Sequence, residues 1–170
     1  MSDENMAEDF ILKKTENHQR ILDVGCGDAG LLIKIAKRNK SAELNCVDSE
    51  VEYARSNIEK GGYSHRIKCV DAKAERIPFK SHSFDFIYSL RSLHEFYDPV
   101  KVLGKIKRLL IPSGDIMIID WKRGANTGVI ERYYAEGEIK EFMKQAGYNV
   151  DNIKIEEVNR FNVVSYSETS

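Results

Sequence analysis

The sequence predicts an α/β protein with a doubly wound, mainly parallel sheet of seven strands that ends in an antiparallel hairpin. Two observations predict this fold. Short apolar runs alternate with segments of helical apolar spacing through residues 20–146, and the two strand-like runs that follow have no helix between them. A helix that connects two strands of one sheet makes them parallel and places ligand-binding loops at their carboxyl ends. Strands separated by only a few residues can pair only as an antiparallel hairpin.

Each element follows from the spacing of its apolar residues. Strands are expected at 20–24, 44–47, 66–70, 84–88 and 115–120, with the closing hairpin at 152–158 and 160–167. Helices are expected around 31–36, 50–59, 102–110 and 139–146, the last ended by Gly147. The segment "IPSG" contains a proline and a glycine, and it predicts a turn before the strand at 115–120.

Length and composition predict one globular domain over 1–170, with an N-terminal helix or arm at 1–19 and the core at 20–170. The acidic start lacks the order of a secretion signal, and no apolar run is long enough to span a bilayer. We therefore expect a cytoplasmic protein. The formal net charge of −1 gives no reason to expect nucleic acid as a partner.

The three cysteines, Cys26, Cys46 and Cys69, have no CxxC spacing, and an odd count favours reduced, buried thiols. No metal site is expected. The segment "HEFYD" departs from the zinc motif HExxH because Asp98 stands in place of the second histidine.

The segment "ILDVGCGDAG" (21–30) places glycines directly after the first strand. Gly25 and Gly27 can adopt positive φ and let the backbone approach a ligand, although a tight packing turn would have the same pattern. Asp48 closes the second strand, 18 residues beyond Gly30, where a carboxylate can accept both ribose hydroxyls of an adenosine. These features fit a nicotinamide dinucleotide as well as any other adenosine ligand.

Asp23 distinguishes the two ligands. A carboxylate two residues before Gly25 is a poor neighbour for a doubly anionic pyrophosphate. S-adenosylmethionine has no phosphate, and a carboxylate stabilises its sulfonium and ammonium cations. The plainer interpretation of Asp23 is a surface or loop-capping residue.

The segments "ILDVGCGDAG", "NCVDSE", "FDFIYSLRSLHEF" and "IPSGDIMIIDW" occur in the order and spacing of class I S-adenosylmethionine-dependent methyltransferases, which the chain resembles over nearly its whole length. The closing stretch, from "DIMIIDWKRG" to "FMKQAGYNV", is most similar to the small ubiquinone and menaquinone biosynthesis C-methyltransferases. The resemblance implies a Rossmann-like methyltransferase fold. It also implies S-adenosylmethionine as cofactor, with S-adenosylhomocysteine as its product.

Carried over by residue, the resemblance implies a set of cofactor contacts. The backbone of Gly25, Cys26 and Gly27 would lie against the methionine part, with Asp23 near its ammonium. Asp48 would hold the ribose, with Ser49 beside it, and Ser89 and Leu90 would line the methyl-donor side. Relatives usually place an acidic residue five positions before the proline that Pro78 matches, where this chain has Lys73. Either Asp71 meets the adenine amino group, or the backbone around Ala72 and Ala74 does.

Methyl transfer is an in-line displacement, which requires alignment, exclusion of water and, for some acceptors, removal of a proton. His94, which follows the fourth strand, is the candidate base, and a structural histidine is the alternative. Arg91 is a candidate contact for an anionic group on the acceptor, or a plain surface arginine. Tyr133 and Tyr134 either contact the acceptor or pack the next helix.

The leading hypothesis is methyl transfer to a small-molecule acceptor. The alternatives are a non-catalytic domain that binds the cofactor and regulates a partner, and an NAD(P)-dependent oxidoreductase, which Asp23 disfavours. Residues 1–18, the loop at 122–134 or a second subunit of a homodimer could cover the site.

Overall fold

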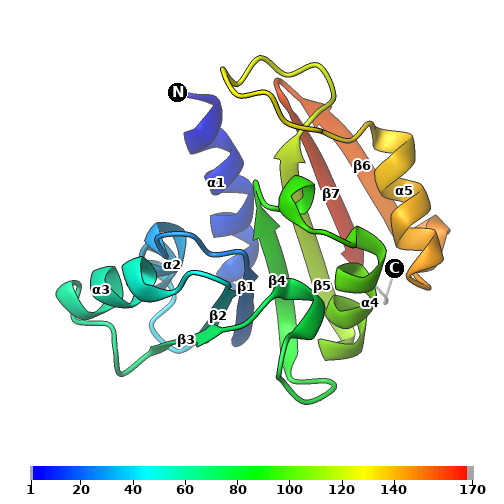
Figure 1. The fold of residues 1–170 in the computed structure, drawn as a ribbon. Helices are drawn as coiled ribbons and strands as arrows, with labels where there is room; N and C mark the ends of the chain where they lie inside the picture. Colours follow the sequence, from blue (N-terminus) through cyan, green and yellow to red (C-terminus); the bar gives the residue numbers. More distant parts are fainter. Residues whose placement is uncertain (1, 168–170) are drawn as a thin grey trace.

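A computed structural model of the chain describes residues 2–167. Its seven strands form one sheet in the order β3-β2-β1-β4-β5-β7-β6 (Figure 1). The strands are β1 (Arg20–Val24), β2 (Glu43–Asp48), β3 (Ile67–Asp71), β4 (Phe84–Leu90), β5 (Leu110–Trp121), β6 (Ile153–Val158) and β7 (Phe161–Ser167). The first five are parallel, whereas β7 is antiparallel to both β5 and β6. The predicted mainly parallel sheet with a closing hairpin is confirmed.

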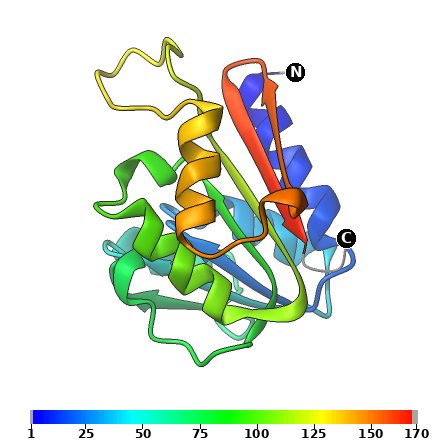
Figure 2. The ribbon, with the colours of Figure 1, turned by 90° about the vertical axis from the view of Figure 1, so that its right-hand side faces the viewer.

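Helices cover both faces of this sheet, as Figures 1 and 2 show. They are α1 (Asp3–Thr15), α2 (Gly30–Arg38), α3 (Glu52–Lys60), α4 (Pro99–Leu109) and α5 (Glu136–Gln145). The first three bury their apolar residues against one face, and α4 and α5 bury theirs against the other. Asp98, which replaces the second histidine of a zinc motif, instead caps α4 by accepting a hydrogen bond from the Lys101 amide.

The predicted turn at "IPSG" is wrong, because β5 runs through it from Leu110 to Trp121. The pairing with β4 shifts register between Phe84 and Phe86, which opens a bulge beside the proline and the glycine. A bulge tolerates the missing amide hydrogen of Pro112. Gly114 suits the same place, since a Cβ there would meet Leu110 at 2.6 Å.

The expectation of three reduced cysteines is also wrong for two of them. Cys46 and Cys69 form a disulfide between β2 and β3. They are register partners on neighbouring strands, with Cα atoms 4.6 Å apart, which lies within the range for a disulfide. Linear spacing does not reveal this pairing because the α3 crossover separates the two strands. Cys26 is a buried free thiol, as predicted.

The carboxyl ends of β1, β4 and β5 meet at one edge of the sheet. In Figure 1 the N-terminal end of α1 and the loop at 122–134 lie at this same edge. The expected N-terminal helix is present, whereas residue 1 and residues 168–170 of the proposed domain lie outside the described range. Within residues 2–167, no helix is both long and apolar enough to cross a membrane.

Candidate functional site

Two adjoining cavities form a cleft at this edge, and both are lined by Gly25, Asp48, Ser92 and Glu95. The smaller, of about 230 Å³, extends over the loop that follows β3, and the larger, of about 580 Å³, extends under the glycine loop toward α1. Of the predicted cofactor residues, those that line the cleft are Asp23, Gly25, Cys26, Gly27, Asp48, Ser49, Ala72, Lys73, Ala74 and Leu90. The chain therefore brings most of the predicted set together.

The glycine loop turns sharply because Gly25 has a φ of +82°, in the left-handed region that favours glycine. Its amide donates to the Val47 carbonyl at 2.8 Å, and its carbonyl accepts from the Ser92 hydroxyl at 3.1 Å. A Cβ at this position would lie 2.5 Å from the Ser92 hydroxyl oxygen. Gly25 is thus required both by the backbone conformation and by the close approach of the residues after β4.

Gly25→Ala is expected to lower the free energy of unfolding by about 2–3 kcal/mol, through left-handed strain and overpacking against Ser92. The matched control is Gly124→Ala, because Gly124 has a φ of +83° and open space where a Cβ would lie. That control is expected to cost about 1 kcal/mol from backbone strain alone. Urea unfolding of both variants measures the difference, and equal losses would show that the Ser92 contact is unimportant.

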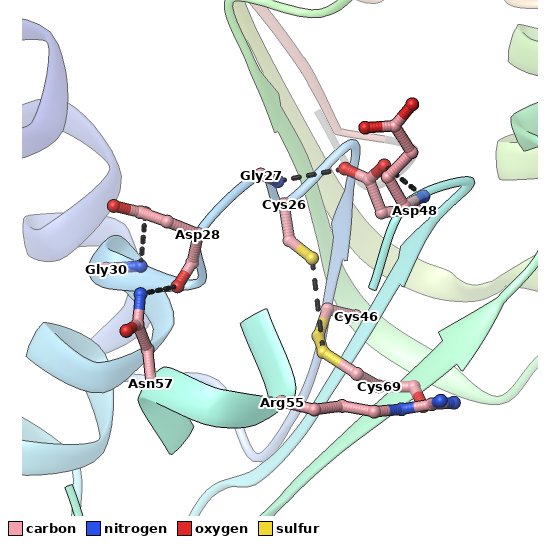
Figure 3. Close-up of a disulfide and its surroundings, with 10 residues drawn as sticks. Cys26, Gly27, Asp28, Gly30, Cys46, Asp48, Arg55, Asn57 and Cys69 are labelled. Carbon is pink, nitrogen blue, oxygen red and sulfur yellow. Dashed lines mark hydrogen bonds between the residues drawn. A yellow bond between two sulfur atoms is a disulfide. The ribbon is translucent and has the colours of Figure 1, made fainter. Parts of the chain in front are cut away.

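Asp48 already holds two backbone amides. Its Oδ2 accepts from Gly27 N at 2.9 Å, and its Oδ1 accepts from Glu50 N at 3.1 Å (Figure 3). An ionised carboxylate has about four acceptor positions, so roughly two stay available toward the cleft. Asp48 can therefore both fix the glycine loop and bind a diol.

Asp23 is a buried carboxyl group beneath the glycine loop, and its side chain lines the larger cavity. Burial raises the pKa of Asp23 to about 7, and the charges of Asp48 and Asp28 add to the rise. The adjacent Tyr88 hydroxyl offsets only part of this rise in the pKa of Asp23. The two groups interact without a hydrogen bond of normal geometry, and neither Asp23 Oδ1 nor the hydroxyl has a partner among the described residues. A cation in the cleft would satisfy this carboxylate.

The loop after β3 places Ala72, Lys73 and Ala74 along the smaller cavity. Asp71 does not line it: this residue ends the edge strand β3 and its side chain is exposed. The Ala72 amide, by contrast, donates to the Asp48 carbonyl at 3.0 Å, which keeps the following residues against the cleft. Of the two candidates that the sequence left open, the 72–74 segment lines the cleft and Asp71 does not.

The end of β4 supplies Leu90 and Arg91 to the larger cavity, but not Ser89. Ser89 is only 1% exposed because it lies within the paired part of β4, opposite Ile118 of β5. Arg91 has a φ of +57° and its guanidinium lies 3.3 Å from Glu4 of α1. An anionic acceptor would have to displace this solvent-exposed pair.

His94 does not line either cavity, in contrast to its predicted place at the cofactor's reactive edge. Its ring is 5% exposed and lies between two carboxylates: Nδ1 is 2.7 Å from Asp120 of β5, and Nε2 is 3.0 Å from Glu131 of the 122–134 loop. Burial alone lowers the pKa of His94, but the hydrogen bond and charge of Asp120, with Glu95 and Glu131, raise it overall. The ring is turned toward the loop because Asp120 fixes Nδ1.

Residues 15–162 match a family model described as "Methyltransferase domain". This match covers most of the chain, from the end of α1 into β7. The chain belongs to this methyltransferase domain family. Its mainly parallel seven-stranded sheet with a closing hairpin is the fold that the sequence resemblance implied.

Solved and curated methyltransferases agree with this assignment. The fold is similar to that of a SAM-dependent methyltransferase from Aquifex aeolicus, with a TM-score of 0.79, 23% identity and coverage of 98% of this chain and 93% of the other. A sterol 4-C-methyltransferase of Caenorhabditis elegans is 31% identical over 65% of this chain and 34% of its own length. The ubiquinone/menaquinone biosynthesis C-methyltransferase UbiE of Rickettsia prowazekii is 25% identical over 84% and 56%. The chain thus spans about a third to just over a half of these two curated relatives.

The charged residues that line the larger cavity of this methyltransferase domain fit a cationic cofactor. Five carboxylates line the larger cavity: Glu8, Asp23, Asp28, Asp48 and Glu95. The two basic residues there, Lys34 and Arg91, are already paired with Glu8 and Glu4 of α1. A pyrophosphate would meet an excess of negative charge, whereas a sulfonium and an ammonium would be stabilised.

Sequence reasoning missed several residues that shape the site: Glu8, Ser92, Glu95, Asp120 and Glu131. Asp120 could have been found, because it lies at the carboxyl end of the predicted strand "DIMIID". Glu8 and Glu131 come from α1 and an irregular loop, whose positions depend on tertiary packing.

The two predicted tyrosines have different surroundings. The ring of Tyr133 lies edge-on to that of His94, with ring centres 5.0 Å apart, while Tyr134 packs against Phe142 of α5. The packing interpretation therefore holds for Tyr134.

Proposed function

We propose that the protein transfers a methyl group from S-adenosylmethionine to a small-molecule acceptor. The observation that carries this proposal is the buried Asp23 carboxyl group beneath a sharply turned glycine loop, without a hydrogen-bond partner for Oδ1 among the described residues. Keeping such a group is costly unless a ligand uses it, and a cation is the ligand it prefers. Membership of the methyltransferase domain family supports the same cofactor.

In this proposal each end of the cleft has its own task. When bound, S-adenosylmethionine supplies a methyl group on a positively charged sulfur. Asp23 would pair with its ammonium group, Asp48 would accept hydrogen bonds from its ribose hydroxyls, and the backbone of 72–74 would border its adenine. The glycine loop lets the methionine part lie against Gly25 and Gly27 without steric hindrance. These residues would hold the cofactor in the cleft, next to the residues at the end of β4.

The acceptor side is formed by Leu90, Arg91 and the residues around His94. We propose that His94, positioned by Asp120, removes a proton from a hydroxyl or an acidic C–H group of the acceptor. In the structure, the Glu131 carboxylate lies 3.0 Å from Nε2 of His94. The loop at 122–134 must therefore move, or the acceptor must displace Glu131, before His94 can act as a base.

Asp48→Ala is expected to weaken S-adenosylmethionine binding by about 1–3 kcal/mol, the cost of losing a charge-assisted acceptor for two hydroxyls. Glu50→Ala is the matched control, because it removes a neighbouring charge that does not line the cleft. Calorimetric titration measures both affinities, and thermal unfolding checks that both variants are folded. Unchanged affinity in a folded Asp48→Ala protein would remove the ribose role.

The proposed function is tested by incubating the protein with methyl-labelled S-adenosylmethionine and fractionated small-molecule extract. We expect S-adenosylhomocysteine and one labelled product to accumulate together, and mass spectrometry of the product identifies the acceptor. Tight cofactor binding with no turnover on any fraction would instead favour a non-catalytic binding domain.

A further inference from the structure

Three sulfur atoms lie together directly below the glycine loop. The sulfurs of Cys26, Cys46 and Cys69 all lie within 4.8 Å of one another. Cys46 and Cys69 are joined as a disulfide, and the free Cys26 sulfur is 4.0 Å from that of Cys69. Figure 3 shows the Cys26 side chain pointing from the loop toward this disulfide. The proposed methyl transfer uses none of these sulfurs.

The cysteine cluster lies between the glycine loop and a second cavity, which Cys69 lines. Cys26 stands between Gly25 and Gly27 and lines the larger cavity of the cleft. Cys69 lines a separate cavity of about 260 Å³, together with Arg55, Ile58, Glu59, Ser64 and Ile67. A small thiol can therefore approach Cys69 from outside, while Cys46 is fully buried.

We propose that these cysteines form a thiol–disulfide exchange site in which Cys69 pairs with either Cys46 or Cys26, and that the Cys26–Cys69 pairing weakens cofactor binding. The second part rests on the proposed binding of S-adenosylmethionine at the glycine loop. In the exchange, the Cys26 thiolate attacks the Cys69 sulfur and forms a new disulfide. The Cys46–Cys69 bond breaks, and the Cys46 thiolate takes up the proton that Cys26 released. One disulfide replaces another, so no oxidant is consumed.

The new pairing changes the loop because the two sulfurs must approach from 4.0 Å to about 2.05 Å. Cys69 is held in β3 by its register with β2, whereas Cys26 lies in a turn. The movement therefore falls mainly on the glycine loop. The hydrogen bond from Gly27 to Asp48, 2.9 Å long, lies one residue away and is expected to break. Both the methionine and the ribose contacts would be disturbed.

Electrostatics slows the attack of Cys26 on the disulfide. Burial raises the pKa of the Cys26 thiol, and the charges of Asp23, Asp48 and Asp28 raise it further. A protonated thiol is a poor nucleophile, so the Cys46–Cys69 pairing persists until Cys26 is deprotonated. An external dithiol that enters beside Cys69 reduces the disulfide to two thiols and is itself oxidised to a disulfide, which leaves all three cysteines reduced.

The test uses two full-length variants, each compared with its own reduced form. In Cys46→Ser, the sulfur nearest to Cys69 is that of Cys26; in Cys26→Ser, the pairing seen in the structure is kept. Each is oxidised with oxidised glutathione, which becomes two glutathione thiols, or reduced with dithiothreitol, and is titrated calorimetrically with S-adenosylmethionine. We expect oxidised Cys46→Ser to bind at least about tenfold more weakly than its reduced form. Cys26→Ser should change by less than about twofold.

Disulfide mapping of the native protein makes the result independent of the variants. The three cysteines fall on different tryptic peptides, since Lys34, Lys40, Arg55 and Lys68 separate them. After equilibration in glutathione buffer, acid quenching and digestion, both Cys46–Cys69 and Cys26–Cys69 peptides are expected. Cys46–Cys69 as the sole linkage at every glutathione ratio, or equal affinities for the two forms of Cys46→Ser, overturns the proposal. Absence of binding by the reduced native protein would instead count against the proposed function, while mapping still decides the exchange.

Discussion

Asp23→Asn is expected to weaken S-adenosylmethionine binding about 10- to 100-fold at pH 8, because it removes the buried charge that pairs with the ligand's ammonium. The pKa of Asp23 is about 7 in the free protein, so only the ionised fraction is ready to bind. Native affinity, expressed relative to Asp23→Asn, should therefore fall about tenfold from pH 8 to pH 6. Calorimetry at several pH values measures this ratio, in which the ligand's own titration cancels.

The same substitution is expected to stabilise the free protein above pH 7. The folded-state pKa of about 7 exceeds the ordinary value of 3.8, so the folded state binds more protons between these values. Native stability therefore falls as pH rises from 4 to 7, by up to about 4 kcal/mol. Above pH 7, Asp23→Asn gains this amount less the cost of burying the amide. Asp28→Asn, at an exposed carboxylate in the same cleft, is the control for general charge. If Asp23→Asn and native protein show the same pH dependence of unfolding, the raised pKa is wrong.

Asp120→Asn is expected to destabilise the protein by about 3 kcal/mol at pH 6, because it removes the charge of a buried pair. Asp120 is 2% exposed and accepts from the His94 amide at 2.8 Å, as well as contacting His94 Nδ1 at 2.7 Å. The folded-state pKa of His94 is raised above 6.5. Its contribution is thus complete below pH 6.5 and is lost as pH rises through the folded-state pKa. The penalty of Asp120→Asn should consequently shrink at pH 9.

Proton NMR follows this pair directly, since the chain has only four histidines. The His94 resonance is assigned by its loss in His94→Gln, and its titration midpoint is expected to fall in Asp120→Asn. Glu131→Gln is the matched comparison, because Glu131 contacts the other ring nitrogen from a more exposed position. It should lower the midpoint less. A midpoint unaffected by Asp120→Asn would show that this carboxylate does not position a charged His94.

The fold could be predicted from sequence because strands buried on both faces and amphipathic helices leave clear apolar patterns. Gly25, Gly27 and Asp48 were predictable for a related reason, since they follow strands whose carboxyl ends must meet. The glycine and proline of "IPSG" led to the wrong prediction of a turn, because a bulge and a turn use the same residues. The place of His94 was not predictable, because it depends on Asp120 and on Glu131 from a loop without periodic structure.

The pairing of the cysteines could not be predicted from the sequence either. Cys46 and Cys69 are partners only through the register of β2 with β3, which a single sequence does not specify. Asp71 likewise ends a strand as expected, yet it is exposed and does not line the cleft, unlike the residues that follow it. Strand ends were thus well placed, whereas the direction of each side chain depended on the assembled sheet.

We propose that the acidic cleft under the glycine loop binds a sulfonium nucleoside and rejects a dinucleotide. The most direct measurement is calorimetric titration of the native protein at pH 8 with S-adenosylmethionine, S-adenosylhomocysteine, NAD+ and NADH in separate runs. We expect saturable binding of one S-adenosylmethionine or one S-adenosylhomocysteine per chain and no saturable heat with either dinucleotide. Saturation by NAD+ or NADH, with no affinity for S-adenosylmethionine or S-adenosylhomocysteine, would contradict it.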